Sequence, residues 1–78
     1  MEEERRKECE NLGRNIARYR KESGLTQSGL VLKANLSRGY LSQIEVGSID
    51  KTPLLGMLFT IAKALNVPVY RLFMRDDK

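Results

Sequence analysis

Histidine and tryptophan are absent from these 78 residues, and cysteine occurs only once. A chain without histidine and with a single thiol lacks the side chains that most often build metal sites and acid–base catalysts. The glutamates near the N-terminus form a charged run and not a positioned acid–base pair. We therefore predict that the protein is not an enzyme, and that it has no catalytic residue, no metal and no cofactor.

Long apolar runs are also missing. The longest, from Leu54 to Phe59, is far shorter than the roughly 20 residues of a membrane-spanning helix. The Glu-rich N-terminus lacks the apolar core of a secretory signal. The lone Cys9 cannot close a disulfide within the chain, which suits a reducing compartment. We expect a cytoplasmic protein with no membrane partner and no small-molecule ligand.

Positive charge is what the chain has in excess. Its net charge is +4, although the first ten residues hold five Glu against three basic residues. The remaining chain therefore carries 11 basic and five acidic residues. A basic body of this kind suits a polyanion such as double-stranded DNA. Charge alone would fit a ribosomal or membrane-surface protein equally well.

The spacing of apolar residues predicts a single all-α domain over residues 1–78, with frayed ends at 1–5 and 75–78. A first helix from about residue 6 to Ser23 would place Cys9, Leu12, Ile16 and Tyr19 on the core and end at Gly24. A later helix would begin after Thr52 and end at Asn66. Its expected buried face is Leu55, Leu58, Phe59, Ala62 and Leu65. A last short helix, residues 69–73, would close the core with Leu72 and Phe73.

Residues 27–46 are predicted to form two short helices joined by a tight turn. Thr26 caps the first helix, Asn35 ends it in a left-handed conformation, and Ser37 caps the second. A helix, a turn of three to four residues and a helix match the spacing of the DNA-binding helix-turn-helix. At about 100° per residue, Leu41 and Ile44 share the inner face of the second helix.

The outer face of that second helix carries polar and small side chains. We assign base readout to Arg38, Gly39, Ser42 and Gln43, because Arg and Gln can each bond two atoms of a base edge and Gly39 permits close approach. Tyr40 on the flank is a candidate contact to a base step or a phosphate. The candidate contacts to the DNA backbone are Gln27, Ser37, Ser48 and Lys51. The alternative is an ordinary solvated helix face.

Taken together, these residues resemble the lambda-repressor-like, Cro/C1-type (XRE) helix-turn-helix family. The resemblance rests on the stretches GLTQ and KANLSRGYLSQIEVG, and it continues to Phe73. Val31, Asn35 and Val46 depart from the usual pattern, and Val46 lacks a polar group that in relatives can reach the DNA backbone. The resemblance implies a compact five-helix DNA-binding domain, encoded by a bacterium or a phage, in which Arg20 and Glu45 form a structural ion pair.

Stand-alone members of this family include phage repressors, antitoxins and controller proteins of restriction–modification systems. The Ser-Arg-x-Tyr-Leu-Ser helix and the lack of an effector domain in these residues are most similar to the controller proteins. These bind as dimers ahead of their own genes, and RNA polymerase is then a candidate further partner. The competing hypothesis is an antitoxin-like module that binds a partner protein.

A homodimer is expected because one recognition helix reads only a few base pairs. Two-fold dimers that bind inverted half-sites roughly 34 Å apart solve that problem. The candidate dimer interface lies on the last two helices and comprises Met57, Ile61, Val67, Val69 and Tyr70.

Overall fold

The computed structural model describes residues 2–48 and 53–75, and its regular elements over these ranges are all helical. Within these ranges, four α-helices and a 3₁₀-helix follow one another as α1 (Glu2–Glu22), α2 (Gln27–Ala34), α3 (Arg38–Val46), α4 (Leu55–Leu65) and η2 (Val69–Phe73). The predicted all-α fold is therefore confirmed. The last element, however, is a 3₁₀-helix, which is usual for a piece of five residues.

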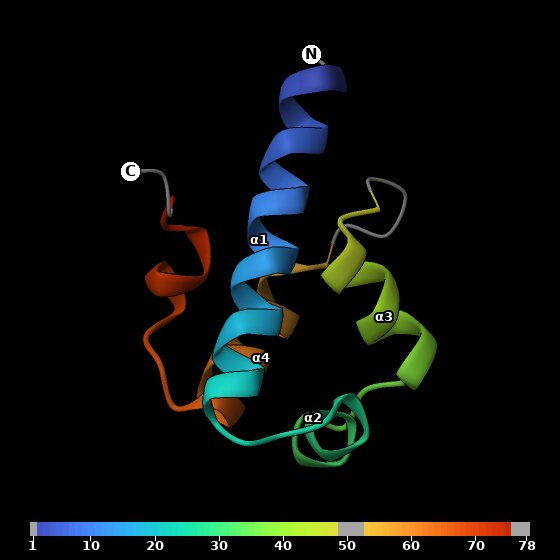
Figure 1. Cartoon of the computed structure of the whole chain (residues 1–78), viewed down its shortest axis with the longest axis vertical. Helices are drawn as coiled ribbons and strands as arrows, with labels where there is room; N and C mark the ends of the chain where they lie inside the picture. Colours follow the sequence, from blue (N-terminus) through green and yellow to red (C-terminus); the bar gives the residue numbers. More distant parts are fainter. Residues whose placement is uncertain (1, 49–52, 76–78) are drawn as a thin grey trace.

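Helix α1 runs through the middle of the molecule, with α3 on one side and η2 on the other (Figure 1). It packs against both, while α2 packs against α3 and α4, and α4 packs against η2. The helix-turn-helix thus forms one side of the molecule and is supported from behind by α1 and α4.

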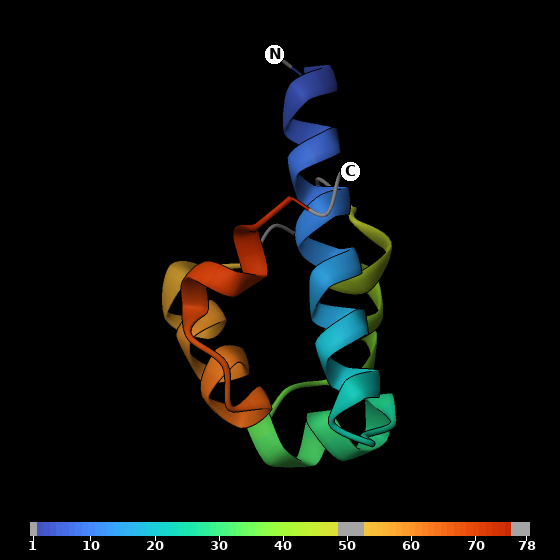
Figure 2. The same cartoon turned by 60° about the vertical axis from the view of Figure 1, so that its left-hand side comes forward.

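The first turns of α1 project beyond the other helices, as Figures 1 and 2 both show. The helix begins at Glu2, so residues 2–5 of the end predicted to be frayed are helical in the structure. Glu2 pairs with Arg5 at 3.1 Å, and Glu3 pairs with Arg6. Acidic side chains in a first turn and ion pairs three residues apart both stabilise a helix. Residues 76–78 of the predicted C-terminal end lie outside the described residues.

The core lies between α1 and the other four elements. Its fully buried large side chains are Ile16, Leu30, Leu41, Ile61 and Leu72. Cys9 and Leu12 are buried as predicted, and Tyr19 packs partly against the core. The first helix and the helix-turn-helix therefore present to the core the faces that their sequences predict.

The buried face of α4 differs from the prediction. Leu58, Ala62 and Leu65 are buried, but Leu55 and Phe59 are 59% and 53% exposed. Ile61 is buried in their place, so the buried face of α4 is rotated about the helix axis away from Leu55 and Phe59. Phe73 is also 49% exposed and does not close the core. Thr52 lies outside the described residues, and Leu54 stands at the start of α4 without a side-chain cap.

The burial of Ile61 corrects one expectation about the dimer. Its side chain is completely inaccessible within a single chain, so it is not available to a second copy. Of the other candidates, Met57, Val67 and Val69 are half-buried against the core, whereas Tyr70 is 59% exposed.

Two buried asparagines of α1 hold the C-terminal segment, and sequence patterns did not reveal this. The Asn15 side-chain amide donates to the backbone carbonyls of Leu72 and Met74 at 2.9 and 2.6 Å. Asn11 donates to the Met74 carbonyl at 3.3 Å. These contacts satisfy buried amide donors, which would otherwise cost stability, and they fix η2 against α1.

Close backbone contact at two glycines fixes α3 against α1. A Cβ atom at Gly13 would lie 2.2 Å from the carbonyl oxygen of Ile44 and 2.7 Å from that of Glu45. At Gly47, where φ is +82°, a Cβ would lie 2.7 Å from the Cα of Glu10. The two helices therefore meet through their main chains, without side chains between them.

Candidate nucleic-acid interface

The ends of α2 and α3 are formed by the residues that the sequence predicts. Thr26 Oγ1 accepts a hydrogen bond from the Gly29 N–H at 3.0 Å, and Ser37 Oγ accepts one from the Tyr40 N–H at 3.1 Å. Asn35 adopts the left-handed conformation at φ 58° and ends α2. These caps set the short turn that joins the two helices.

The two faces of α3 are also as predicted. Leu41 and Ile44 are buried, and Gly39, Gln43 and Val46 are exposed. A Cβ atom at Gly39 would meet no other atom within 4 Å. The fold itself therefore does not require a glycine there, and the open surface leaves room for another molecule.

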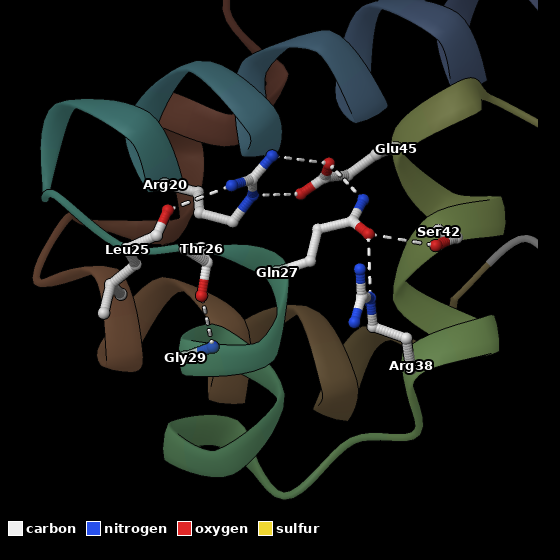
Figure 3. Close-up of polar contacts among 8 residues, drawn as sticks. All are labelled: Arg20, Leu25, Thr26, Gln27, Gly29, Arg38, Ser42 and Glu45. Atoms are coloured by element: carbon white, nitrogen blue, oxygen red, sulfur yellow. Dashed lines mark hydrogen bonds and ion pairs between the residues drawn. The ribbon is translucent and has the colours of Figure 1, made fainter.

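The expected ion pair between Arg20 and Glu45 is present and largely buried (Figure 3). The Arg20 Nε and Nη2 groups donate to the two carboxylate oxygens of Glu45 at 2.8 and 3.1 Å. Arg20 Nη1 also donates to the Leu25 carbonyl at 2.9 Å. The two side chains retain only 10% and 7% of their accessible surface.

Gln27 lies at the centre of a hydrogen-bond network that links this ion pair to the outer residues of α3 (Figure 3). Its Nε2 group donates to Glu45 Oε1 at 2.9 Å. Its Oε1 atom accepts from both Arg38 Nε and Ser42 Oγ, each at 3.1 Å. The side chain assigned from sequence to the DNA backbone is thus already engaged within the protein.

Arg38 lies on the flank of α3 that faces α2, and not at the centre of the outer face. Besides its contact to Gln27, its Nη1 group donates to Ser28 Oγ at 2.9 Å. A guanidinium has five N–H donors, so three remain for another molecule. Because Arg38 is exposed, these donors are accessible to a base or a phosphate.

The remaining predicted contacts are distributed along the edge of the helix-turn-helix. Tyr40 is half-buried and packs partly against the core. The Ser37 hydroxyl is occupied as a cap. Ser48 is half-buried, and its N–H donates to the Gln43 carbonyl at 3.1 Å. Lys51 lies outside the described residues.

Sequence reasoning missed Ser28 and the central place of Gln27. One signal could have revealed the network. Arg38, Ser42 and Glu45 follow one another at intervals of four and three residues, which places three polar side chains on one flank of a helix. A shared partner on the neighbouring helix is the simplest way to satisfy them.

The charges of α2 and α3 favour a polyanion. Glu45 is the only acidic residue in either helix, and its carboxylate is neutralised by Arg20. Arg38 and Lys33 remain exposed on the two helices. A phosphate that approaches these helices therefore meets exposed cations, while their one carboxylate is turned inward and paired.

The chain belongs to the helix-turn-helix family, whose family model matches residues 16–72. Among similar proteins is the HTH-type transcriptional regulator SinR of Bacillus licheniformis, which is 34% identical over 67 residues. This match covers 86% of the chain but only 60% of SinR, so the chain spans less than two thirds of that relative.

Two solved structures are similar to the chain. The structure of SinR, described as the master regulator for biofilm formation, in complex with DNA has a TM-score of 0.74 and 35% identity. That likeness covers 81% of this chain and 98% of that one. The restriction–modification controller protein C.AhdI from Aeromonas hydrophila also has a TM-score of 0.74, with 26% identity, and the likeness covers 83% of this chain and 96% of C.AhdI.

In residues 2–48 and 53–75, no three His, Cys, Asp or Glu side chains come together as metal ligands. Over the same residues, no helix has both the length and the apolar character needed to cross a membrane.

Proposed function

We propose that this protein is a sequence-specific DNA-binding transcriptional regulator, and that α3 is its recognition helix. The observation that carries the proposal is the outer side of α3. There, exposed Gly39 and Gln43 adjoin Ser42, and the helix's single acid is withdrawn into an ion pair with Arg20. This surface combines open space, base-reading amide and hydroxyl groups, and a neighbouring cation.

Membership of the helix-turn-helix family and the likeness to SinR bound to DNA support double-stranded DNA as the partner. The likeness to C.AhdI supports the narrower proposal of an autoregulating controller protein of a restriction–modification system. A phage-type repressor is the alternative. RNA polymerase is a further candidate partner for a regulator that activates transcription.

The proposed regulator acts as a homodimer on inverted-repeat operators. Large apolar side chains stay exposed on α4 and η2, which pack against each other. These side chains are Leu55, Phe59, Tyr70 and Phe73, which are between 49% and 59% exposed. Covering them with a second copy would remove apolar surface from water and stabilise the dimer. An antitoxin-like module would use the same surface for a different protein.

The test is a gel shift of the pure protein on the DNA upstream of its own gene, with random DNA as competitor and salt varied. We expect a discrete complex that resists the competitor and contains two chains. The Arg38→Ala variant should weaken it, whereas Lys63→Ala, which removes one exposed charge from α4, should not. Diffuse, salt-sensitive binding alone would contradict sequence-specific recognition. Capture of a neighbouring gene product without DNA binding would favour the interaction module.

A further inference from the structure

The network around Gln27 allows its side-chain amide only one orientation (Figure 3). The carboxylate of Glu45, paired with Arg20, can only accept, so the amide atom 2.9 Å from it must be the NH₂ group. The Arg38 guanidinium can only donate, so the amide atom 3.1 Å from its Nε must be the oxygen. A reversed amide would place the Gln27 oxygen against the Glu45 carboxylate, so that two acceptors meet. It would also place the Gln27 NH₂ group against the Arg38 guanidinium, so that two donors meet.

This orientation decides how the Ser42 hydroxyl is used. Ser42 Oγ lies 3.1 Å from the same Gln27 oxygen. Because that oxygen only accepts, Ser42 must donate its single proton to it. A serine hydroxyl can ordinarily donate or accept and therefore suits several bases. With its proton committed to Gln27, Ser42 offers only lone pairs to a molecule on the outer side of α3.

We propose that Ser42 determines specificity by accepting a hydrogen bond from an exocyclic amino group, adenine N6 or cytosine N4, in the major groove. These two groups are the donors that bases present there, whereas guanine O6 and thymine O4 are acceptors. Guanine O6 or thymine O4 placed opposite Ser42 would face the lone pairs of the hydroxyl and could form no hydrogen bond with it. Gln27 and Glu45 are positioning residues in this scheme. The inference rests on the proposed function, since it requires α3 to enter the groove.

The surroundings of Ser42 leave space for such a contact. Gly39 precedes it by three residues, and residues three apart are neighbours on a helix surface. A Cβ atom at Gly39 would meet nothing within 4 Å. The space over Gly39, beside the half-buried Ser42, is therefore open to a base edge.

The first test is selection of preferred sequences from a pool of randomised DNA duplexes by the full chain and its variants. The wild type should prefer adenine or cytosine at one position per half-site, by about three- to ten-fold over guanine or thymine, the value of one hydrogen bond. Ser42→Ala should lose that preference. Gln27→Met frees the Ser42 proton, so Ser42 could then donate or accept. This variant should bind adenine, cytosine, guanine or thymine at that position about equally. Lys63→Ala, an exposed change on α4 outside the proposed DNA surface, is the control, which should keep the preference at the Ser42 position.

The second test removes the amino group from the DNA. In the selected duplex, purine replaces adenine, or 2-pyrimidinone replaces cytosine, at the Ser42 position. The wild type should bind the altered duplex about three- to ten-fold more weakly, and Ser42→Ala should bind both duplexes equally. Ser42→Ala places a good helix former inside α3, and a thermal melt checks that it folds.

The outcomes separate the inference from the function on which it rests. A wild type that selects no sequence refutes the proposed function, and the inference with it. If the wild type selects a sequence and Ser42→Ala selects that same sequence, the inference about Ser42 is overturned, but the proposed function stands. The inference is also overturned if the wild type prefers guanine or thymine at one position and Ser42→Ala loses that preference, because Ser42 would then donate its proton to the base.

Discussion

Replacing Glu45 by Ala should destabilise the fold strongly, although the residue lies near the end of a nine-residue helix. The change leaves Arg20, whose side chain is only 10% exposed, without its carboxylate partner. Removing one member of a buried ion pair typically costs about 3–5 kcal/mol. Arg20 keeps its bond to the Leu25 carbonyl, so we expect the lower end, about 3 kcal/mol. In a domain of this size that corresponds to a melting temperature lower by roughly 12–24 °C.

Urea unfolding followed by circular dichroism measures this loss. The control is Glu8→Ala, which breaks the exposed ion pair between Glu8 and Arg75; its length, 2.9 Å, is close to the 2.8 Å of the buried pair. Exposed pairs contribute less than about 1 kcal/mol because water and salt screen them. Replacing both Arg20 and Glu45 by Ala should cost less than the two single changes together, since neither charge is then left alone. A Glu45→Ala loss no larger than that of Glu8→Ala would refute the reasoning.

Other substitutions test the remaining features. Gly13→Ala should cost about 1–3 kcal/mol in urea unfolding, because its Cβ would strike the Ile44 carbonyl; the control is Gly56→Ala, which has open space in α4 and should be neutral or stabilising by up to about 1 kcal/mol, since Ala is the better helix former. Gly39→Ala should not lower the melting temperature, since Ala is the better helix former, but it should weaken binding to a selected duplex; equal affinity would show that nothing approaches there. Arg38→Ala should cost about 1–3 kcal/mol on selected DNA and less on random DNA, measured by competition; equal losses would mean a phosphate contact. Asn15→Ala should cost about 1–3 kcal/mol, because it removes the hydrogen bonds to the Leu72 and Met74 carbonyls. It should also speed chymotryptic cleavage at Phe73, and unchanged cleavage would show that Asn15 does not hold the C-terminal segment.

Local chemistry explains why the helix-turn-helix was predictable. Thr26, Asn35 and Ser37 act on backbone groups within a few residues of themselves, so their roles can be derived from sequence alone. The inner face of α3 follows from helical spacing. The pairing of Arg20 with Glu45 spans 25 residues, and only the family resemblance supplied it.

The errors concern features that depend on tertiary packing. The spacing of apolar residues in α4 is compatible with two different buried faces. Packing against the other helices buries the face that contains Ile61 and leaves Phe59 exposed. The bonds from Asn15 to carbonyls 57 and 59 residues away have no local signature. For the same reason, the donor and acceptor ends of the Gln27 amide became clear only when its partners were placed around it.

The network around Gln27 also limits how the specificity of this protein can be exchanged for that of a relative. Transplanting the outer residues of α3 alone would move Arg38 and Ser42 next to a different α2, which need not supply the same amide oxygen. A successful exchange should carry Gln27 and Ser28 with α3, as one unit of two helices. The close contact at Gly13 involves main-chain atoms of Ile44 and Glu45, so it does not depend on which outer side chains such a chimera carries.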